Sequence, residues 1–238
     1  LDLTGIKKIN LDDTKITDKS MKVLSKVPTL QEVYVDETAV TDKGVYELAA
    51  LPNLKIFKCE RIGITDDGIK CLSALPQLNT LDVGLCEGIT LKSVEYLKKM
   101  PRLSALRISK TVIKPRHLGG FKNLHRLSCE FSSLSQEDIE AILSMTSLKR
   151  LTLTGSNLTG DQLMSFARLP NLEMLMLSGC RHISEAQVDR FNAKRDSVFI
   201  QTILPYKKTY PRNYSYRNML KANSALKNNP DKTTSAYL

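Results

Sequence analysis

The chain has 238 residues, and its apolar fraction of 42% is that of an ordinary folded protein. No stretch approaches about 18 consecutive apolar residues, so the sequence predicts no membrane-spanning helix. The net charge of +10 is unevenly placed, because residues 201–238 hold seven Lys and Arg against one acid, which gives +6 there and +4 elsewhere.

The sequence repeats itself with a period of about 24 residues. The first part of the repeat is Leu30-x-x-Val33-x-Val35, and a turn, a hydroxyl residue and helix-spaced apolar positions follow it. Successive copies start at Ile6, Leu30, Leu54, Leu78, Leu103, Leu124, Leu148 and Leu172. A fixed period of this size predicts a solenoid, in which each repeat is completed by its neighbours. Function is therefore expected on a surface and not in a cleft.

Each repeat opens with a predicted strand. The apolar residues at positions one, four and six, such as Leu148, Leu151 and Leu153, suit a short strand with one buried face. Because every repeat ends where the next begins, the strands are predicted to lie parallel and side by side in one curved sheet.

A helix is predicted after each strand. Its first turn follows a Thr or Ser that can cap it, and Ser135 with Asp138 has the spacing of a capping box. Val45, Leu48 and Leu51 then form one narrow apolar stripe. Prolines that end the helices stand at Pro52, Pro76, Pro101 and Pro170.

Two segments depart from the repeat. In repeat five, residues 103–123, the run at 114–121 is too short and too rich in Pro and Gly for a normal helix, which predicts a single turn or an irregular loop. That change is either a neutral deletion or a joint or second contact surface. After Phe191 the repeat fades, and residues 198–200 are predicted to add a last strand that covers the apolar end.

These observations assign residues 1–200 to a repeat domain of about eight copies and residues 201–238 to a basic tail. Four of its five Tyr, within residues 206–216, lie among Lys and Arg, and we expect the tail to be either disordered or packed on the last repeat. The chain begins Leu1-Asp2-Leu3, without an initiator Met or a leader, as in a mature form or a piece of a longer protein.

The repeats resemble a known family. Leu-x-x-Leu-x-Leu followed by Asn, Cys or Thr is the leucine-rich repeat. Residues 78–90 and 172–184 resemble the cysteine-containing repeats of F-box substrate adaptors, and the 24-residue copies with Thr-Asp, as at 40–44, resemble the repeats of bacterial proteins of this class. The resemblance implies an α/β fold: a leucine-rich repeat solenoid, shaped as a right-handed horseshoe, with a concave parallel β-sheet and α-helices on the convex side. It also implies that the concave side holds another protein.

The sequence shows no catalytic constellation. It has no glycine-rich phosphate loop, no Cys-x-x-Cys and no His pair at metal spacing, and His117, His125 and His182 fall in different repeats. We therefore expect no enzyme activity, no cofactor, no metal and no small-molecule substrate.

The five cysteines, an odd number, argue against a complete disulfide framework. Cys59 and Cys86 are the one pair whose repeat positions allow an approach. All five are expected to be reduced and small apolar residues, which favours an intracellular and cytoplasmic location.

Positions three, five, seven and eight of each repeat alternate with the buried anchors and are predicted to point out of the concave face. The candidate partner-binding residues at these positions are Tyr34, Asp36, Ile56, Lys58, Asp82, Arg107, Arg126, Phe131, Arg150, Met174 and Met176. We expect Arg107, Arg126 and Arg150 to form a basic line that can pair with acids of a partner. Met174 and Met176 are expected to be bare apolar anchors, or to be covered by the tail.

The predicted function is a non-catalytic protein–protein interaction module that binds a partner on the concave sheet, as a substrate-recognition or adaptor subunit or as a bacterial repeat protein. Two alternatives remain. The basic tail could bind nucleic acid or an acidic surface. Otherwise the chain is the recognition domain of a larger enzyme, such as a ubiquitin ligase.

Overall fold

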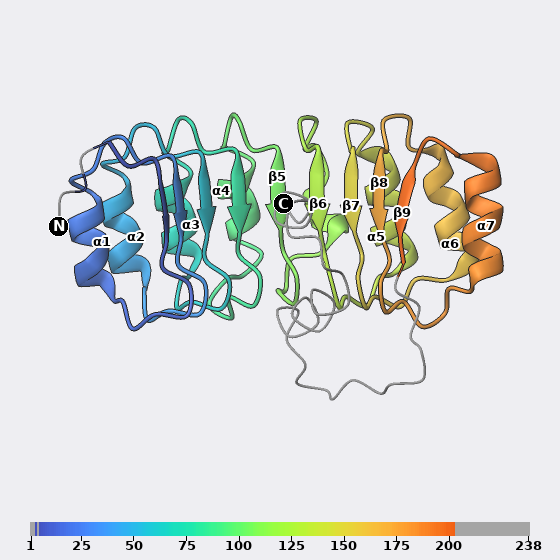
Figure 1. Cartoon of the computed structure of the whole chain (residues 1–238), viewed down its shortest axis with the longest axis horizontal. Helices are drawn as coiled ribbons and strands as arrows, with labels where there is room; N and C mark the ends of the chain where they lie inside the picture. Colours follow the sequence, from blue (N-terminus) through green and yellow to red (C-terminus); the bar gives the residue numbers. More distant parts are fainter. Residues whose placement is uncertain (1–2, 4, 203–238) are drawn as a thin grey trace. The chain divides into compact units, whose positions relative to one another are not determined.

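The computed structural model describes residue 3 and residues 5–202. In this part of the chain, nine strands form one parallel sheet in which each strand pairs with the next along the sequence (Figure 1). The strands are β1 (Lys8–Asn10), β2 (Glu32–Tyr34), β3 (Ile56–Lys58), β4 (Thr80–Asp82), β5 (Ala105–Arg107), β6 (Arg126–Ser128), β7 (Arg150–Thr152), β8 (Met174–Met176) and β9 (Phe199–Gln201). The predicted tail lies outside the described residues from 203 onward.

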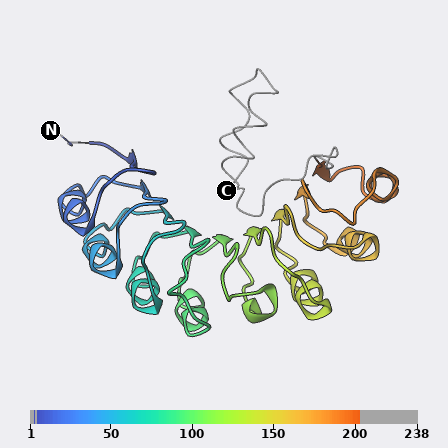
Figure 2. The same cartoon turned by 90° about the horizontal axis from the view of Figure 1, so that it is seen from below.

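A helical segment follows each of the first eight strands. These segments are α1 (Asp18–Leu24), α2 (Asp42–Leu48), α3 (Asp66–Leu72), α4 (Ser93–Leu97), the 3₁₀ helix η1 (Pro115–Leu118), α5 (Gln136–Ser144), α6 (Gly160–Ser165) with the short 3₁₀ helix η2 (Phe166–Arg168), and α7 (Glu185–Lys194). Figure 2 shows the strands in an inner row and the helices in an outer row. The predicted fold class, a solenoid with a concave parallel sheet and convex helices, is confirmed.

The core is a layer between the sheet and the helices. The strands pair in register, so that Val33, Phe57 and Leu81 occupy the same level of successive strands and are fully buried. Leu48 and Leu72, from the helix stripes, are also fully buried. Because side chains alternate along a strand, the residues on either side of each buried centre point to the concave face.

Hydroxyl residues cap most of the helices, as the sequence predicts. Ser135, Thr159 and Ser184 each form a capping box with the side chain three positions further on. Thr17 differs, because its side chain makes no capping hydrogen bond to α1.

Aspartates at the first helical position link neighbouring repeats. The Asp18 carboxylate accepts hydrogen bonds from the backbone N of Thr41 at 2.8 Å and from its hydroxyl at 2.9 Å. Asp42 accepts the same pair from Thr65 at 2.9 and 2.6 Å, and Asp66 binds the next repeat in the same way. The Thr-Asp pairs therefore act across repeats, whereas the sequence pattern indicates only a cap within one repeat.

The turn after each of the first eight strands contains one residue with a left-handed backbone, at position eight of the repeat. These residues are Asp13, Glu37, Arg61, Leu85, Lys110, Phe131, Gly155 and Gly179. The conformation costs a non-glycine residue about 1–2 kcal/mol. It turns the chain from the sheet toward the helix layer.

Repeat five forms the four-residue 3₁₀ helix η1 in the segment where the sequence predicts a single turn or an irregular loop. The backbone N–H and the guanidinium of Arg116, a residue of η1, both donate to the buried Asp138 of α5. These contacts link the short segment to the next helix. The predicted last strand is β9, which pairs with β8 at the end of the sheet.

Candidate functional site

The concave face carries all eleven residues predicted from the sequence. Nine of them lie in strands β2 to β8, and Asp36 and Phe131 lie in the turns that follow β2 and β6. Among the described residues, the helices all lie on the other side of the sheet (Figure 2). The face divides into three groups of side chains.

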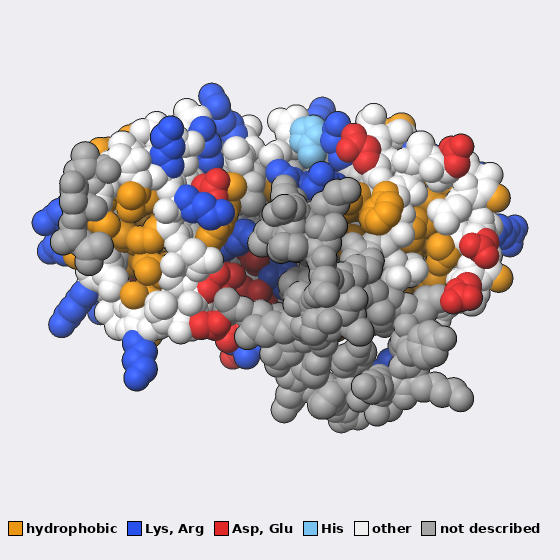
Figure 3. All heavy atoms as spheres, viewed as in Figure 1, with side chains coloured by type: hydrophobic (Ala, Val, Ile, Leu, Met, Phe, Trp, Pro, Cys, Tyr) orange, Lys and Arg blue, Asp and Glu red, His pale blue; other side chains and the backbone are white. Residues whose placement is uncertain are grey.

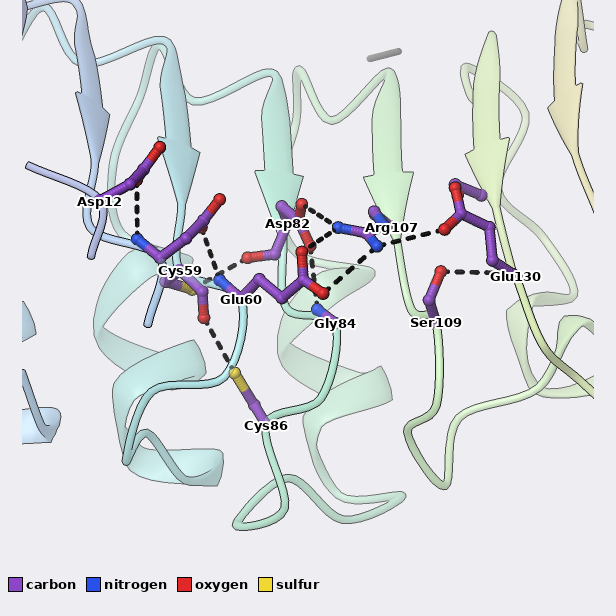
Figure 4. Close-up of polar contacts among 11 residues, drawn as sticks. Asp12, Cys59, Glu60, Asp82, Gly84, Cys86, Arg107, Ser109 and Glu130 are labelled. Atoms are coloured by element: carbon purple, nitrogen blue, oxygen red, sulfur yellow. Dashed lines mark hydrogen bonds and ion pairs between the residues drawn. The ribbon is translucent and has the colours of Figure 1, made fainter. Parts of the chain in front are cut away.

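The central group is an ion-pair cluster around Arg107 (Figure 4). Its guanidinium contacts Glu60 at 2.5 Å, Asp82 at 3.0 Å and Glu130 at 3.2 Å, so that one side chain joins carboxylates from β4 and from the turns after β3 and β6. The side chain reaches Glu60, two repeats away, past Gly84. A Cβ at Gly84 would stand 3.2 Å from Asp82 Oδ1 and in ordinary contact, at 3.6 Å, with the Arg107 Cζ, so the guanidinium lies directly beside this glycine.

The prediction that Arg107 lies in an exposed basic line is wrong, because Arg107 is only 6% exposed. Burial disfavours its charged form, but Asp82, Glu130 and Glu60 outweigh burial and raise the pKa of Arg107 well above its usual value. The repeat pattern gave the direction of the side chain correctly. It could not show that a long side chain lies along the sheet and finds acids from other repeats.

Burial raises the pKa of three carboxyl groups in or beside this cluster, those of Asp36, Glu60 and Glu130. Burial raises the pKa of Asp36 to about 8, and the carboxylates of Asp82 and Asp12 add to the rise. Burial also raises the pKa of Glu60 and of Glu130, although Arg107 opposes both shifts. Asp36 is therefore largely protonated at neutral pH.

Asp36 also has a structural role. Its Oδ1 accepts a hydrogen bond from the backbone N of Glu60 at 2.7 Å, as Asp12 does from Asp36 at 2.9 Å. Ser109 accepts one from Glu130 in the same way. Position seven of the repeat thus joins successive turns of the chain, and one oxygen of Asp36 is already used.

Carboxylate oxygens of Asp36, Glu60 and Asp82 lie within 4.8 Å of one another, which is the spacing of a cation site. The sequence singled out Asp36 and Asp82 and missed Glu60 and Glu130. The signal that could have found them is the acid at position seven of four repeats, at Asp12, Asp36, Glu60 and Glu130.

The second group surrounds Tyr34. Its ring lies between the ammonium groups of Lys8 and Lys58, at 4.8 and 4.9 Å from the ring centroid, and its hydroxyl donates to Glu32 at 2.6 Å. Burial lowers the pKa of Lys58, although Asp82 and Asp36 oppose the shift. Tyr34 is only 9% exposed, so the predicted anchor is covered by its two lysines. Ile56, on the next strand, is half-buried.

The third group lies on β6 to β8 and the turns beside them. Arg126 and Arg150 lie opposite each other on neighbouring strands. Burial lowers the pKa of Arg126, and the positive charge of Arg150 lowers it further. Phe131 is half-buried under the ammonium group of Lys110, which lies 4.8 Å from its ring centroid.

The two methionines of β8 differ. Met174 is half-buried, whereas Met176 is 3% exposed and its sulfur lies 3.5 Å from the hydroxyl of Thr152. The prediction that Met176 is bare is therefore wrong, because its side chain lies along the neighbouring strand instead of standing away from the sheet. The alternative that the tail covers both residues lies outside the described part of the chain.

All five cysteines are free, and four of them are buried in the core. The thiol of Cys86 donates to the carbonyl of Cys59 at 3.0 Å, and that of Cys59 donates to the carbonyl of Asp82 at 2.9 Å (Figure 4). Cys59 and Cys86 therefore lie close together, as their repeat positions allow, and they are joined by a hydrogen bond and not by a disulfide. Burial raises the pKa of Cys180 to about 11, which keeps its thiol protonated and unreactive.

Comparisons with known proteins bear on the fold. No family model matches the chain, and no curated protein matches its sequence. Among solved structures, the chain is similar to an internalin C2 from Listeria monocytogenes, with 18% identity, a TM-score of 0.59, and coverage of 83% of this chain and 80% of that one. It is also similar to the internalin inlF of the same organism, with 20% identity and a TM-score of 0.50, over 87% of this chain and 63% of that one. At this identity the likeness establishes a leucine-rich repeat solenoid and nothing finer.

No helix in the described part of the chain is long and apolar enough to cross a membrane.

Proposed function

We propose that this chain is a protein-interaction module that binds a partner protein on its concave sheet. The observation that supports this most is the continuous face from Tyr34 to Met174, which combines aromatic, apolar and charged side chains. In protein–protein interfaces, a few aromatic and apolar residues contribute most of the binding energy, and polar residues lie around them. Ile56, Phe131 and Met174 keep part of their apolar surface exposed on this face.

The cluster around Arg107 gives the centre of this surface a fixed charge pattern. Its ion pairs tie together residues from four repeats, from Glu60 to Glu130, and so hold the sheet in one shape. A preformed surface loses less conformational entropy on binding than a flexible one. We infer that the cluster positions the partner-binding face and does not itself carry out chemistry.

The test compares two double variants in capture of partner from cell extract. Arg150→Glu with Met174→Glu changes the concave face, and Lys43→Glu with Tyr46→Glu is a matched change on α2, where Tyr46 is 57% exposed. We expect the concave variant to lose the captured protein and the convex control to keep it, with circular dichroism showing that both are folded. Equal capture by both variants would contradict the proposal.

A role as a substrate-recognition or adaptor subunit, or as the recognition part of a larger enzyme such as a ubiquitin ligase, is a finer form of the same proposal. Each requires a further domain beside the binding surface. Sequencing the coding region on both sides of these 238 codons tests it, since an in-frame catalytic or adaptor domain is the expected result. Nucleic-acid binding by the basic tail concerns residues outside the described part of the chain.

We also propose an intracellular location. The support is the set of five free cysteines, four of them buried, which an oxidising compartment would expose to wrong pairing during folding. Fractionation of the source cells tests this, and recovery of the chain only outside the cell would contradict it.

A further inference from the structure

The repeats contain a strongly basic segment, which is not evident from the net charge of the whole chain. Residues 96–129 contain nine Lys and Arg and no Asp or Glu. Since the chain up to residue 200 has a net charge of +4, the rest of the repeats has a net charge of −5. The basic segment coincides with the end of α4 and the irregular fifth repeat.

A groove opens within this segment, where η1 replaces a full helix. It has a volume of about 390 Å³ and runs between the end of α4, with Lys98 and Met100, and the turn that contains Gly119, Phe121 and Lys122. A Cβ placed on Gly119 or on the neighbouring Gly120 would meet no atom within 4 Å, which shows that this wall borders open space. The groove therefore lies beside the shortened repeat.

The groove combines an apolar floor with basic walls. Met100 and Leu103 are 5% and 3% exposed and close its base, and Phe121 is half-buried beside them. Lys98 and Lys122 are exposed, and within residues 3 and 5–202 neither forms an ion pair. Figure 3 shows Lys and Arg side chains along the upper edge of the sheet, where the strands begin.

We propose that this groove is a second docking site, separate from the concave face, for an acidic segment of a partner protein that carries an apolar anchor residue. The charge complementarity selects the partner: a segment rich in Glu or Asp meets cations on both walls, with no carboxylate of residues 96–129 to repel it. The floor of Met100 and Leu103 takes the anchor, whose burial supplies most of the affinity. A nucleic acid would use the cations but would leave the apolar floor unused.

The test uses the full chain and a fluorescein-labelled synthetic peptide with one Phe flanked by Glu residues, followed by fluorescence anisotropy. Lys98→Glu with Lys122→Glu should weaken binding about tenfold or more. Lys207→Glu with Lys208→Glu makes the same charge change in the tail and should leave binding within about twofold. Gly119 lines the groove, and a Cβ there would meet no atom within 4 Å, so Gly119→Leu adds bulk at the groove wall without a clash. It should weaken binding while the far-UV circular dichroism stays that of the wild type.

Three results would overturn the proposal. They are the absence of binding to the wild type, a larger loss in the tail variant than in the groove variant, and equal binding of a peptide in which Ser replaces the Phe. A single-stranded DNA oligonucleotide that binds more tightly than the peptide, and loses affinity in the groove variant, would assign the groove to nucleic acid instead.

Discussion

Replacing Arg107 with Met should destabilise the protein strongly at alkaline pH and much less at acidic pH. The change removes the guanidinium that contacts Glu60, Asp82 and Glu130 while keeping an unbranched side chain in place of the Arg methylene stem. Arg107 is 6% exposed, so the carboxylates left behind have little access to water. Removing one partner from a buried ion pair costs about 3–5 kcal/mol of the free energy of unfolding.

The pH dependence follows from the protons that the carboxylates bind. Burial already raises the pKa of Glu60 and of Glu130 in the folded state, and loss of Arg107 raises both further. The folded variant then binds more protons than the unfolded chain, so its stability falls as the pH rises through the folded pKa values. At about pH 5 the loss should shrink to about 1–2 kcal/mol, which reflects lost hydrogen bonds and packing.

Urea unfolding followed by far-UV circular dichroism, at about pH 5 and about pH 8, measures both values. Arg102→Met is the matched control, because Arg102 is exposed and lies just before β5, the strand that carries Arg107. Its loss should be below about 1 kcal/mol at either pH. An equal loss for Arg107→Met at both pH values, or a larger loss at acidic pH, would refute this reasoning.

Three further predictions concern single side chains. Asp36→Asn keeps the acceptor oxygen but removes a carboxyl group whose pKa is raised to about 8. The wild type should lose stability as the pH rises toward 8, whereas the variant should show a flatter pH profile. In urea unfolding at alkaline pH, the variant should be more stable than the wild type by about 1–2 kcal/mol. Gly44→Ala would place a Cβ 2.6 Å from Asp18 Oδ1, so it should cost about 1–3 kcal/mol, and an unchanged thermal midpoint would count against it. Asp42→Ala removes both hydrogen bonds to Thr65 and should cost about 1–2 kcal/mol, with amide hydrogen exchange accelerated at the start of α3; uniform exchange along the chain would argue against the inter-repeat contact.

The repeat made the fold predictable from the sequence. All eight copies share the short strand, and most also share a capped helix or a proline that ends it, so their agreement predicts where strands such as Glu32–Tyr34 and helices such as Asp42–Leu48 lie. The alternation within each strand also placed the nine candidate residues that lie in strands on the concave side. These are local signals, and the period of the repeat carries them around the whole sheet.

Contacts between repeats were the part that the sequence could not give. Arg107 and Glu60 are 47 positions apart, and nothing in either repeat alone shows that the guanidinium lies beside Gly84 and reaches Glu60. The contacts of Asp18 with Thr41 span 23 positions and use a residue that already has a place in the helix pattern. Met176 shows the same limit, because a flexible side chain can lie along the sheet or stand away from it.

The most direct test of the proposed concave binding site is hydroxyl-radical footprinting of the chain with and without its captured partner. Phe131 and Met174 report on the concave face, and Tyr46, which is 57% exposed on α2, reports on the convex side. We predict that the partner slows oxidation of Phe131 and Met174 and leaves that of Tyr46 unchanged. Protection of Tyr46 with no change at Phe131 and Met174 would contradict the concave binding site.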